Sequence, residues 1–214
     1  MKVAAICVVA FALTCVVLYS MMPDYQVKVY REHSFIINKE FSEVQRAMGK
    51  DGVLKKILEA NDGEVLEEKW IKKNFHIERP LSKKHRYWHL DGIVMAKILI
   101  RDPSGEMVVD LKQTIHADQK YIRAEIELNR PISIGLTDMN QLVEFKAHGD
   151  GQTIVSMKLY MRLSRKVPFF MQDFADKRMH ESADKQISHF EPIIRDHIAN
   201  AKPGFKIPLI RPRR

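Results

Sequence analysis

The pattern of hydrophobic and polar positions divides the chain into three parts. Residues 3–22 carry no charge, residues 24–200 switch between strand-like and helix-like periods, and residues 201–214 hold five basic residues and no acidic one. Such switching without a low-complexity linker is typical of one folded domain. We therefore expect a hydrophobic N-terminal segment over residues 1–23, one domain over residues 24–200 and a basic tail over residues 201–214.

A period of two residues predicts that most of the domain is β-structure. Residues 25–37, which are rich in Val, Ile, Phe and Tyr, predict the first strand. Turn sequences such as DPSG, NRP and GDG separate most of the further predicted strands, at residues 65–77, 85–93, 95–101, 107–116, 120–128, 139–148 and 153–163. The last four of these have one apolar and one polar face, which indicates an antiparallel sheet that buries one face.

Helical patterns lie on both sides of the strand run. Residues 38–48 and 51–61 each predict a short helix that begins at a capping Asn or Asp side chain. Residues 168–200 predict a long amphipathic helix, in which Pro168 suits the first turn and Pro192 is expected to kink or restart the helix. This long helix is the predicted partner of the apolar face of the sheet.

The inner face of the long helix is unusual because its middle is small or polar. At 3.6 residues per turn it holds the following side chains, with Ser182 beside them: Ala175, Met179, Ala183, Gln186 and Phe190. Because protein interiors are close-packed, another group must approach these small residues. Either a strand packs closely there, or a ligand fills the space.

The order of the predicted elements resembles that of the START-like, or Bet v 1-like (SRPBCC), helix-grip superfamily. The ending RKVPFFMQDFADKRMHESADKQISHFEPIIRDHI looks like the terminal helix of these domains, which often opens with a proline and aromatic residues. The resemblance covers roughly residues 24–200 and implies an α+β fold. In it, a curved antiparallel sheet of about seven strands wraps around the long helix, with a ligand cavity between them.

The implied cavity defines the candidate ligand-binding residues. Methionine suits an adaptable apolar lining, and glutamine supplies polar groups within it. The predicted lining is Gln113, Gln141, Met157, Met161, Met179, Ala183 and Gln186. A purely structural role in core packing is the alternative for each of them. Arg31 and His33, on the first strand, either bind a ligand head group or are paired at the edge of the sheet.

The connector NRPISIGLTDMN carries apolar residues where connectors normally face water. By resemblance to START-like domains, this connection lies beside the mouth of the cavity. We therefore expect a gate formed by Ile132, Ile134, Gly135 and Leu136, in which the glycine supplies backbone freedom. The alternative is that the three aliphatic side chains pack beneath the long helix.

The N-terminal apolar segment is long enough to cross a bilayer. Its 20 residues from Val3 to Met22 rise by ~1.5 Å each and therefore span about 30 Å. A cleaved signal peptide is the alternative, although YSMM is a poor cleavage site. Basic residues follow the segment at Lys28 and Arg31, which favours a single-pass anchor with the domain in the cytosol. A secreted or lumenal domain is expected if the segment is cleaved or inverted.

The net charge of +8 belongs largely to the basic tail. Between residues 23 and 200 there are 29 basic and 27 acidic residues, so the domain lacks the strong basic excess typical of nucleic-acid-binding modules. No nucleic acid partner is expected. A basic tail on a membrane-tethered protein instead suits anionic lipid head groups, or it is merely solvated.

The sequence lacks the common catalytic and cofactor motifs. Both cysteines, Cys7 and Cys15, lie in the apolar segment, and the domain contains no HExxH, GxSxG, P-loop or GxGxxG pattern. We expect no metal, no cofactor and no catalytic residue. The predicted function is a membrane-anchored domain that binds or transfers a lipid or another hydrophobic small molecule. A polyketide cyclase- or hydrolase-type enzyme on the same fold and a ligand-free interaction module are the alternatives.

Overall fold

The strand-forming segments come together as one antiparallel sheet of seven strands. The computed structural model describes residues 19, 22, 24–48, 63–78, 87–102, 105–132 and 135–200. The strands are β1 (Asp24–Ile37), β2 (Gly63–Glu78), β3 (Tyr87–Asp102), β4 (Gly105–Asp118), β5 (Tyr121–Leu128), β6 (Leu136–Ala147) and β7 (Thr153–Lys166). Each strand from β2 to β7 pairs with the next one, and β1 pairs with β7.

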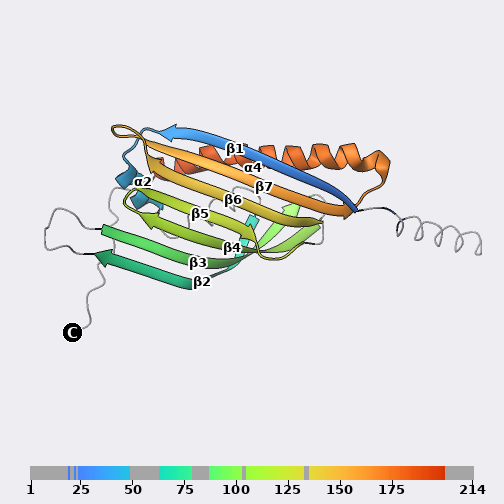
Figure 1. The fold of residues 1–214 in the computed structure, drawn as a ribbon, viewed down its shortest axis with the longest axis horizontal. Coiled ribbons are helices and arrows are strands. Elements are labelled where there is room, and N and C mark those ends of the chain that lie inside the picture. The colour runs from blue at the N-terminus through green and yellow to red at the C-terminus, as the bar shows by residue number, and fades with distance from the viewer. Residues whose placement is uncertain are drawn as a thin grey trace, which may run out of the picture.

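The described helices lie on one side of this sheet. The short helix α2 (Phe41–Met48) follows β1, and the 3-10 helix η1 (Phe169–Met171) leads directly into the long helix α4 (Gln172–Ala199). Helix α4 packs against β1 and β7, and its last turns contact α2 (Figure 1). The predicted α+β arrangement, a sheet around a long C-terminal helix, is confirmed.

Alternation along the strands correctly predicted which face of the sheet is buried. On β7 the side chains of Val155, Met157, Leu159 and Met161 are buried, whereas Lys158 between them is exposed. Strand β1 presents its buried residues on the same side, at Val27, Val29, Phe35 and Ile37. Burial of such side chains, at about 25 cal/mol per Å² of apolar surface, holds the helix onto the sheet.

The two strands predicted at residues 85–93 and 95–101 are in fact one strand, β3. The prediction was wrong because no turn interrupts this segment. Val94, Ala96 and Ile98 are buried on one face, and β4 pairs with β3 without a shift in register. Continuous pairing with a neighbouring strand outweighs a weak local turn signal.

The long helix also differs in detail from the prediction. Pro168 has an extended backbone with ψ 142°, so it precedes η1 instead of beginning the helix. Pro192 lies within α4 and does not restart it. Because this proline is exposed, water can satisfy the carbonyl group that loses its helical partner. Ser182, expected beside the inner face, is exposed as well.

Several predicted segments lie outside the described residues. They are the second short helix at residues 52–61, the basic tail at residues 201–214 and almost all of the apolar segment at residues 3–22. Of the helices that the structure describes, none has the length and the apolar composition needed to cross a bilayer.

Strand β2 forms an irregular edge of the sheet. Its pairing with β3 shifts register between Val65 and Glu67 and again between Trp70 and Lys72. The indole ring of Trp70 lies over Gly92 of β3, where an added Cβ atom would be 2.6 Å from Trp70 Cζ3. Glycine at position 92 therefore lets the ring lie against the backbone of the neighbouring strand.

Ala183 lies at a tightly packed contact between α4 and the sheet. It is fully buried, in a cluster that includes Val29 of β1, Leu159 and Met161 of β7, and Met179 one turn earlier on the helix. A larger side chain at this position would have to displace these neighbours.

We predict that Ala183→Leu lowers the free energy of unfolding by about 1–3 kcal/mol, because it overpacks this contact. Chemical denaturation followed by circular dichroism measures the change. Ser182→Leu is the matched control, since its exposed site should alter the free energy by less than about 0.5 kcal/mol. A variant Ala183→Leu as stable as the wild type would mean that open space lies above Ala183.

Candidate ligand-binding site

The register of the sheet places two of the predicted polar residues in one row across its inner face. Gln113 of β4 pairs with Ile126 of β5, which pairs with Gln141 of β6, which pairs with Leu159 of β7. Neighbouring strands are about 4.8 Å apart, so Gln113 and Gln141 lie roughly 10 Å apart, with Ile126 between them. Alternation placed Ile126 on this face, but it was missing from the predicted lining.

Gln141 and Gln186 form a polar pair between the sheet and α4. The Gln186 Nε2 donates to Gln141 Oε1 at 2.9 Å, and Gln141 Nε2 in turn approaches the sulfur of Met157 at 3.1 Å. Gln141 is buried and Gln186 is half-buried. A thioether is a weak acceptor, so the Gln141 amide has a poor partner for a buried donor. The two predicted glutamines are therefore brought together.

The other predicted residues surround this pair within the core. Met161, Met179 and Ala183 belong to one buried cluster between α4 and strands β1 and β7. Met157 is fully buried in the neighbouring cluster, which extends to Phe190 and the C-terminal turns of α4. Side chains of the described core therefore contact each of these four residues. A purely structural role in core packing, the alternative to ligand binding, predicts the same contacts.

A third apolar cluster lies on the inner face of the sheet away from α4. Its buried members come from three central strands, β3, β4 and β5: Ala96, Ile98, Val109, Leu111 and Ile126. Within the described ranges, no residue of α4 belongs to it. Gln113 lies on the same face and is half-buried. It is the predicted lining residue that lies beyond the cover of the helix.

The predicted gate lies where the second and third clusters meet. Ile132 is half-buried and packs against both of them, and Leu136 is buried at the start of β6. Ile134 lies outside the described residues. Gly135 has φ +92°, and its carbonyl accepts a hydrogen bond from the Ser164 amide at 2.7 Å, which ties the connection to β7. Glycine is favoured at this left-handed backbone conformation.

Arg31 and His33 join β1 to α4 through ion pairs. Arg31 Nε donates to Asp184 Oδ1 at 2.5 Å, and His33 Nε2 donates to Glu191 Oε2 at 2.7 Å. Arg195 also donates to Glu191, at 2.7 Å. The two residues are therefore paired at the edge of the sheet, as the alternative to head-group binding expected.

These hydrogen bonds lower the pKa values of the two carboxylates. The hydrogen bond from His33, followed by that from Arg195, holds the pKa of Glu191 below its ordinary value of 4.5. The Arg31 hydrogen bond likewise lowers the pKa of Asp184 from 3.8. Both carboxylates are thus favoured in their charged form when the domain is folded.

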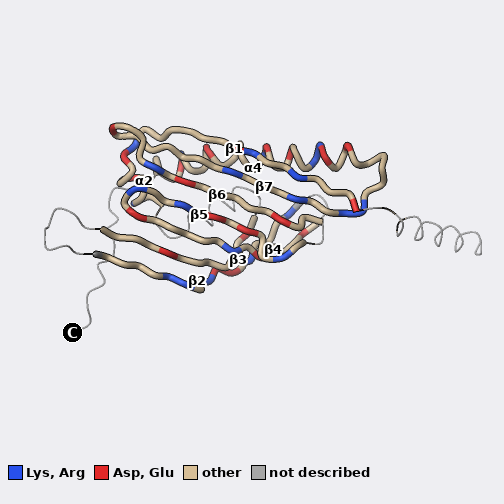
Figure 2. Tube along the Cα trace, viewed as in Figure 1, with Lys and Arg blue, Asp and Glu red and all other residues tan. Residues whose placement is uncertain are grey.

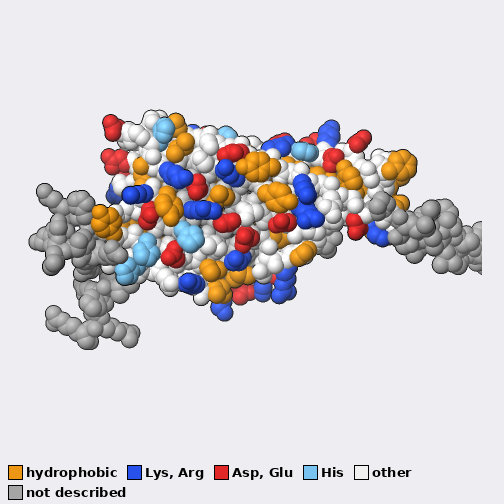
Figure 3. Space-filling view, in the orientation of Figure 1, with side chains coloured by type: hydrophobic (Ala, Val, Ile, Leu, Met, Phe, Trp, Pro, Cys, Tyr) orange, Lys and Arg blue, Asp and Glu red, His pale blue; other side chains and the backbone are white. Residues whose placement is uncertain are grey.

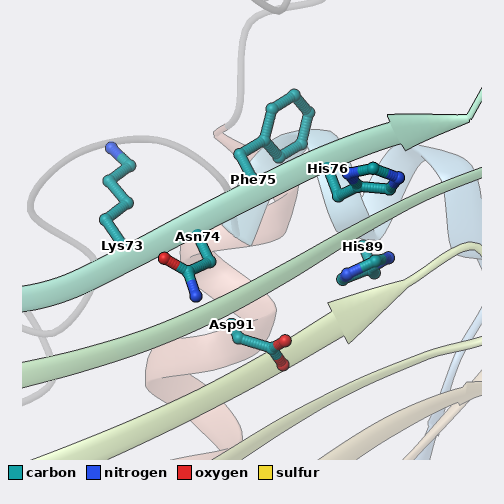
Figure 4. Close-up of a pocket in the computed structure, with 6 residues that line it drawn as sticks. All are labelled: Lys73, Asn74, Phe75, His76, His89 and Asp91. Carbon is teal, nitrogen blue, oxygen red and sulfur yellow. The ribbon is translucent and has the colours of Figure 1, made fainter.

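A shallow depression of about 560 Å³ lies elsewhere, on the edge strand β2 and its neighbour β3. It is lined by Lys73, Asn74, Phe75, His76, His89 and Asp91, of which several point to the same side of the two strands (Figure 4). His89 and Asp91, with their partners His76 and Asn74 on β2, lie on the opposite face of the sheet from Val94, whereas Lys73 and Phe75 lie on the same face as Val94. The depression therefore lies at the edge of the sheet, away from α4. It contains none of the predicted ligand residues.

The described surface carries charged residues of both signs. Basic and acidic residues are interleaved along the strands and α4 (Figure 2). Asp91 accepts a 2.6 Å hydrogen bond from His116, and the rings of His76 and His89 lie 5.2 Å apart. Across the described part of the chain, no group of three or more His, Cys, Asp or Glu residues is arranged to hold a metal ion.

Comparison with solved structures gives matches over most of the chain. The Zhui aromatase/cyclase from Streptomyces sp. R1128 has a TM-score of 0.50 at 10% identity, covering 84% of this chain and 100% of that one. Ara h 8.0201 has a TM-score of 0.45 at 12% identity, covering 81% and 100%. A truncated norcoclaurine synthase from Thalictrum flavum has a TM-score of 0.42 at 10% identity, covering 83% of this chain and 97% of that one. Neither a protein-family model nor a curated protein sequence matches this chain.

The likeness to the aromatase/cyclase concerns the fold. Together with the seven-stranded sheet and the long C-terminal helix, it shows that this chain has a helix-grip fold like that of the aromatase/cyclase. At 10% identity the likeness does not extend to activity or substrate.

We predict that Glu191→Gln destabilises the domain near neutral pH and that this effect fades in acid. Because folding lowers the pKa of Glu191, its charged form contributes stability above pH 4.5, and this contribution is lost as the pH falls through the folded value. Thermal melting between about pH 7 and about pH 3 measures the difference from wild type. Glu181→Gln, on the exposed side of α4, is the control. A difference that stays constant over this range would contradict the assignment.

Proposed function

We propose that this domain binds a hydrophobic small molecule or lipid between α4 and the inner face of the sheet, next to the Gln141–Gln186 pair. The observation that carries the proposal is the third cluster, which lies on the buried face of the sheet beyond the cover of α4. Apolar surface of this kind, with a few converging polar groups, is the usual form of a small-molecule site.

The dimensions of the elements support this location. Seven strands at about 4.8 Å spacing make a sheet about 29 Å wide, whereas a helix with its side chains has a diameter of about 10–12 Å. Helix α4 packs on β1 and β7, so the inner faces of β3, β4 and β5 need other groups to cover them. The third-cluster side chains are already buried in the folded chain, so a ligand beside the helix would take the place of groups that now cover them.

The chemistry of the glutamine pair favours a ligand that carries an oxygen atom. The Gln141 amide donates to a thioether, and a ligand hydroxyl or carbonyl oxygen is a stronger acceptor. The ligand would exchange this weak hydrogen bond for a stronger one while its apolar body packs against the third cluster. A lipid or another hydrophobic molecule with one polar group fits this description.

We further propose that residues 3–22 anchor the chain in a membrane, with the domain in the cytosol, and that the β5–β6 connection is the gate to the site. The length of the uncharged segment supports the anchor. The position of Ile132 between the second and third clusters supports the gate. A protein tethered in this way would meet its ligand at a high local concentration.

Native mass spectrometry of the full chain, purified from cells in mild detergent, tests the binding proposal. We predict a co-purified hydrophobic molecule whose occupancy falls about tenfold in Gln141→Leu/Gln186→Leu, since a lost hydrogen bond costs about 1–1.5 kcal/mol. Changing both partners together leaves neither one unpaired, so the fold should persist. Gln26→Leu, on the exposed face of β1, is the control. A chain without any bound molecule, or a double variant with full occupancy, would contradict the proposal.

A second test addresses the gate. We predict that Ile132→Ser/Ile134→Ser, which spares the buried Leu136, lowers the melting temperature modestly, because Ile132 packs against two clusters, but slows release of the co-purified molecule to lipid vesicles several-fold. Ile36→Ser, at an exposed site on β1, should leave the release rate unchanged. A large loss of stability in the double variant would mean that these side chains serve the core, and an unchanged release rate would end the gate hypothesis.

A further inference from the structure

Four large apolar side chains project into solvent where α4 begins. Phe169 and Phe170 are 84% and 72% exposed, and Met171 and Phe174 next to them are exposed too. None of the residues of η1 is buried. Figure 3 shows hydrophobic side chains at this end of the molecule. Adjacent apolar residues with such exposure mark an interaction surface more often than chance.

Contacts within this group and with the rest of the domain hold its side chains in place. The rings of Phe169 and Phe170 contact each other edge to face, with centroids 5.5 Å apart. The guanidinium of Arg178 lies 5.2 Å from the ring centre of Phe174. The hydroxyl of Tyr25 donates to Asp176 at 2.8 Å and so ties the start of β1 to the first turns of α4. The exposed group is therefore fixed to the folded domain.

The apolar N-terminal segment ends at the same place. Lys166, two residues before Pro168, lies with its Nζ 5.9 Å from the ring centre of Tyr19. Tyr19 belongs to the uncharged segment that begins at Val3. Residues span at most about 3.6 Å each, so the exposed aromatic group lies within roughly 20 Å of that segment. A bilayer that holds the segment would be close to these rings.

We propose that Phe169, Phe170, Met171 and Phe174, which we call the aromatic wedge, insert into the interface of the bilayer that holds residues 3–22. This inference rests on the anchor in the proposed function. Aromatic rings are favoured at the level of the lipid head groups. The exposed basic side chains of Arg165, Lys177 and Arg178 flank the wedge and suit anionic head groups, and they outnumber the one exposed acid within it, Asp173.

The wedge would also set the orientation of the domain. The β5–β6 connection is bonded to the end of β7 through Gly135 and Ser164, close in sequence to Pro168. The proposed gate and the wedge therefore lie at the same end of the sheet. An anchor alone allows the domain to rotate, whereas an anchor and an inserted wedge hold this end against the membrane.

Depth-dependent quenching by brominated lipids tests the wedge in the full chain, reconstituted in vesicles of phosphatidylcholine and phosphatidylserine. We expect the emission added by Phe170→Trp, over that of Trp70 and Trp88, to fall at least about twofold with brominated lipid, because the ring enters the interface. Tyr87→Trp is the matched control: it is exposed but lies at the opposite end of the sheet (Figure 1). Its emission should change little.

A second pair of variants separates insertion from mere proximity. Phe174→Trp should be quenched, and Phe169→Ser/Phe170→Ser in the same chain should reduce that quenching by half or more. Vesicle flotation of each variant independently shows whether the anchor binds the chain to the vesicles. Flotation without quenching at position 170 overturns the wedge but leaves the anchor, whereas a chain that does not float overturns both. Equal quenching at positions 87 and 170, or a stable dimer that protects position 170 without lipid, also overturns the proposal.

Discussion

The structure depends on a mismatch between one helix and a wide sheet. The strands β1 to β7 form a single layer with one apolar face, and α4 covers the part of it formed by β1 and β7. The remaining strands must bury their inner side chains against one another, against connections such as the one at Ile132, or against a molecule that is not part of the chain. The candidate site lies at the boundary between the part of the apolar face that α4 covers and the part that other groups bury.

The polar groups that the structure brings to this boundary are uncharged. Gln113, Gln141 and Gln186 are amides, and Met157 is a thioether, so none of them exchanges protons near neutral pH. The side chains of Arg31 and His33, which join the sheet to α4, are paired with carboxylates at the edge of the domain. A cyclase or hydrolase on this fold would need an acid or a base within the site. The solved aromatase/cyclase shares its architecture with this chain. The chemistry of each protein depends on its own side chains, because a shared fold does not imply a shared function.

The sequence predicted those features that a single segment determines. Alternation in β7 correctly placed Met157 and Met161 on the buried face, and the 3.6-residue period placed Met179 and Ala183 on the inner side of α4. Features that depend on distant segments could not be predicted in this way. The Gln141–Gln186 bond and the Arg31–Asp184 pair join residues 45 and 153 positions apart. The continuity of β3 through residue 94 likewise depends on pairing with its neighbours, and the exposure of Phe169 depends on what packs around it.

The irregular edge of the sheet has a consequence for a protein held at a surface. Molecules confined to two dimensions meet often, and an unpaired edge strand is a template on which a strand from another copy can add. The two register shifts in β2 interrupt the regular spacing of its outer amide and carbonyl groups. Exposed lysines such as Lys69, Lys72 and Lys73 are typical of protected edge strands. The same irregularity that brings Trp70 over Gly92 thus discourages polymerisation through this edge. If the proposed anchor crowds copies on a membrane, crowding would not by itself lead to fibres.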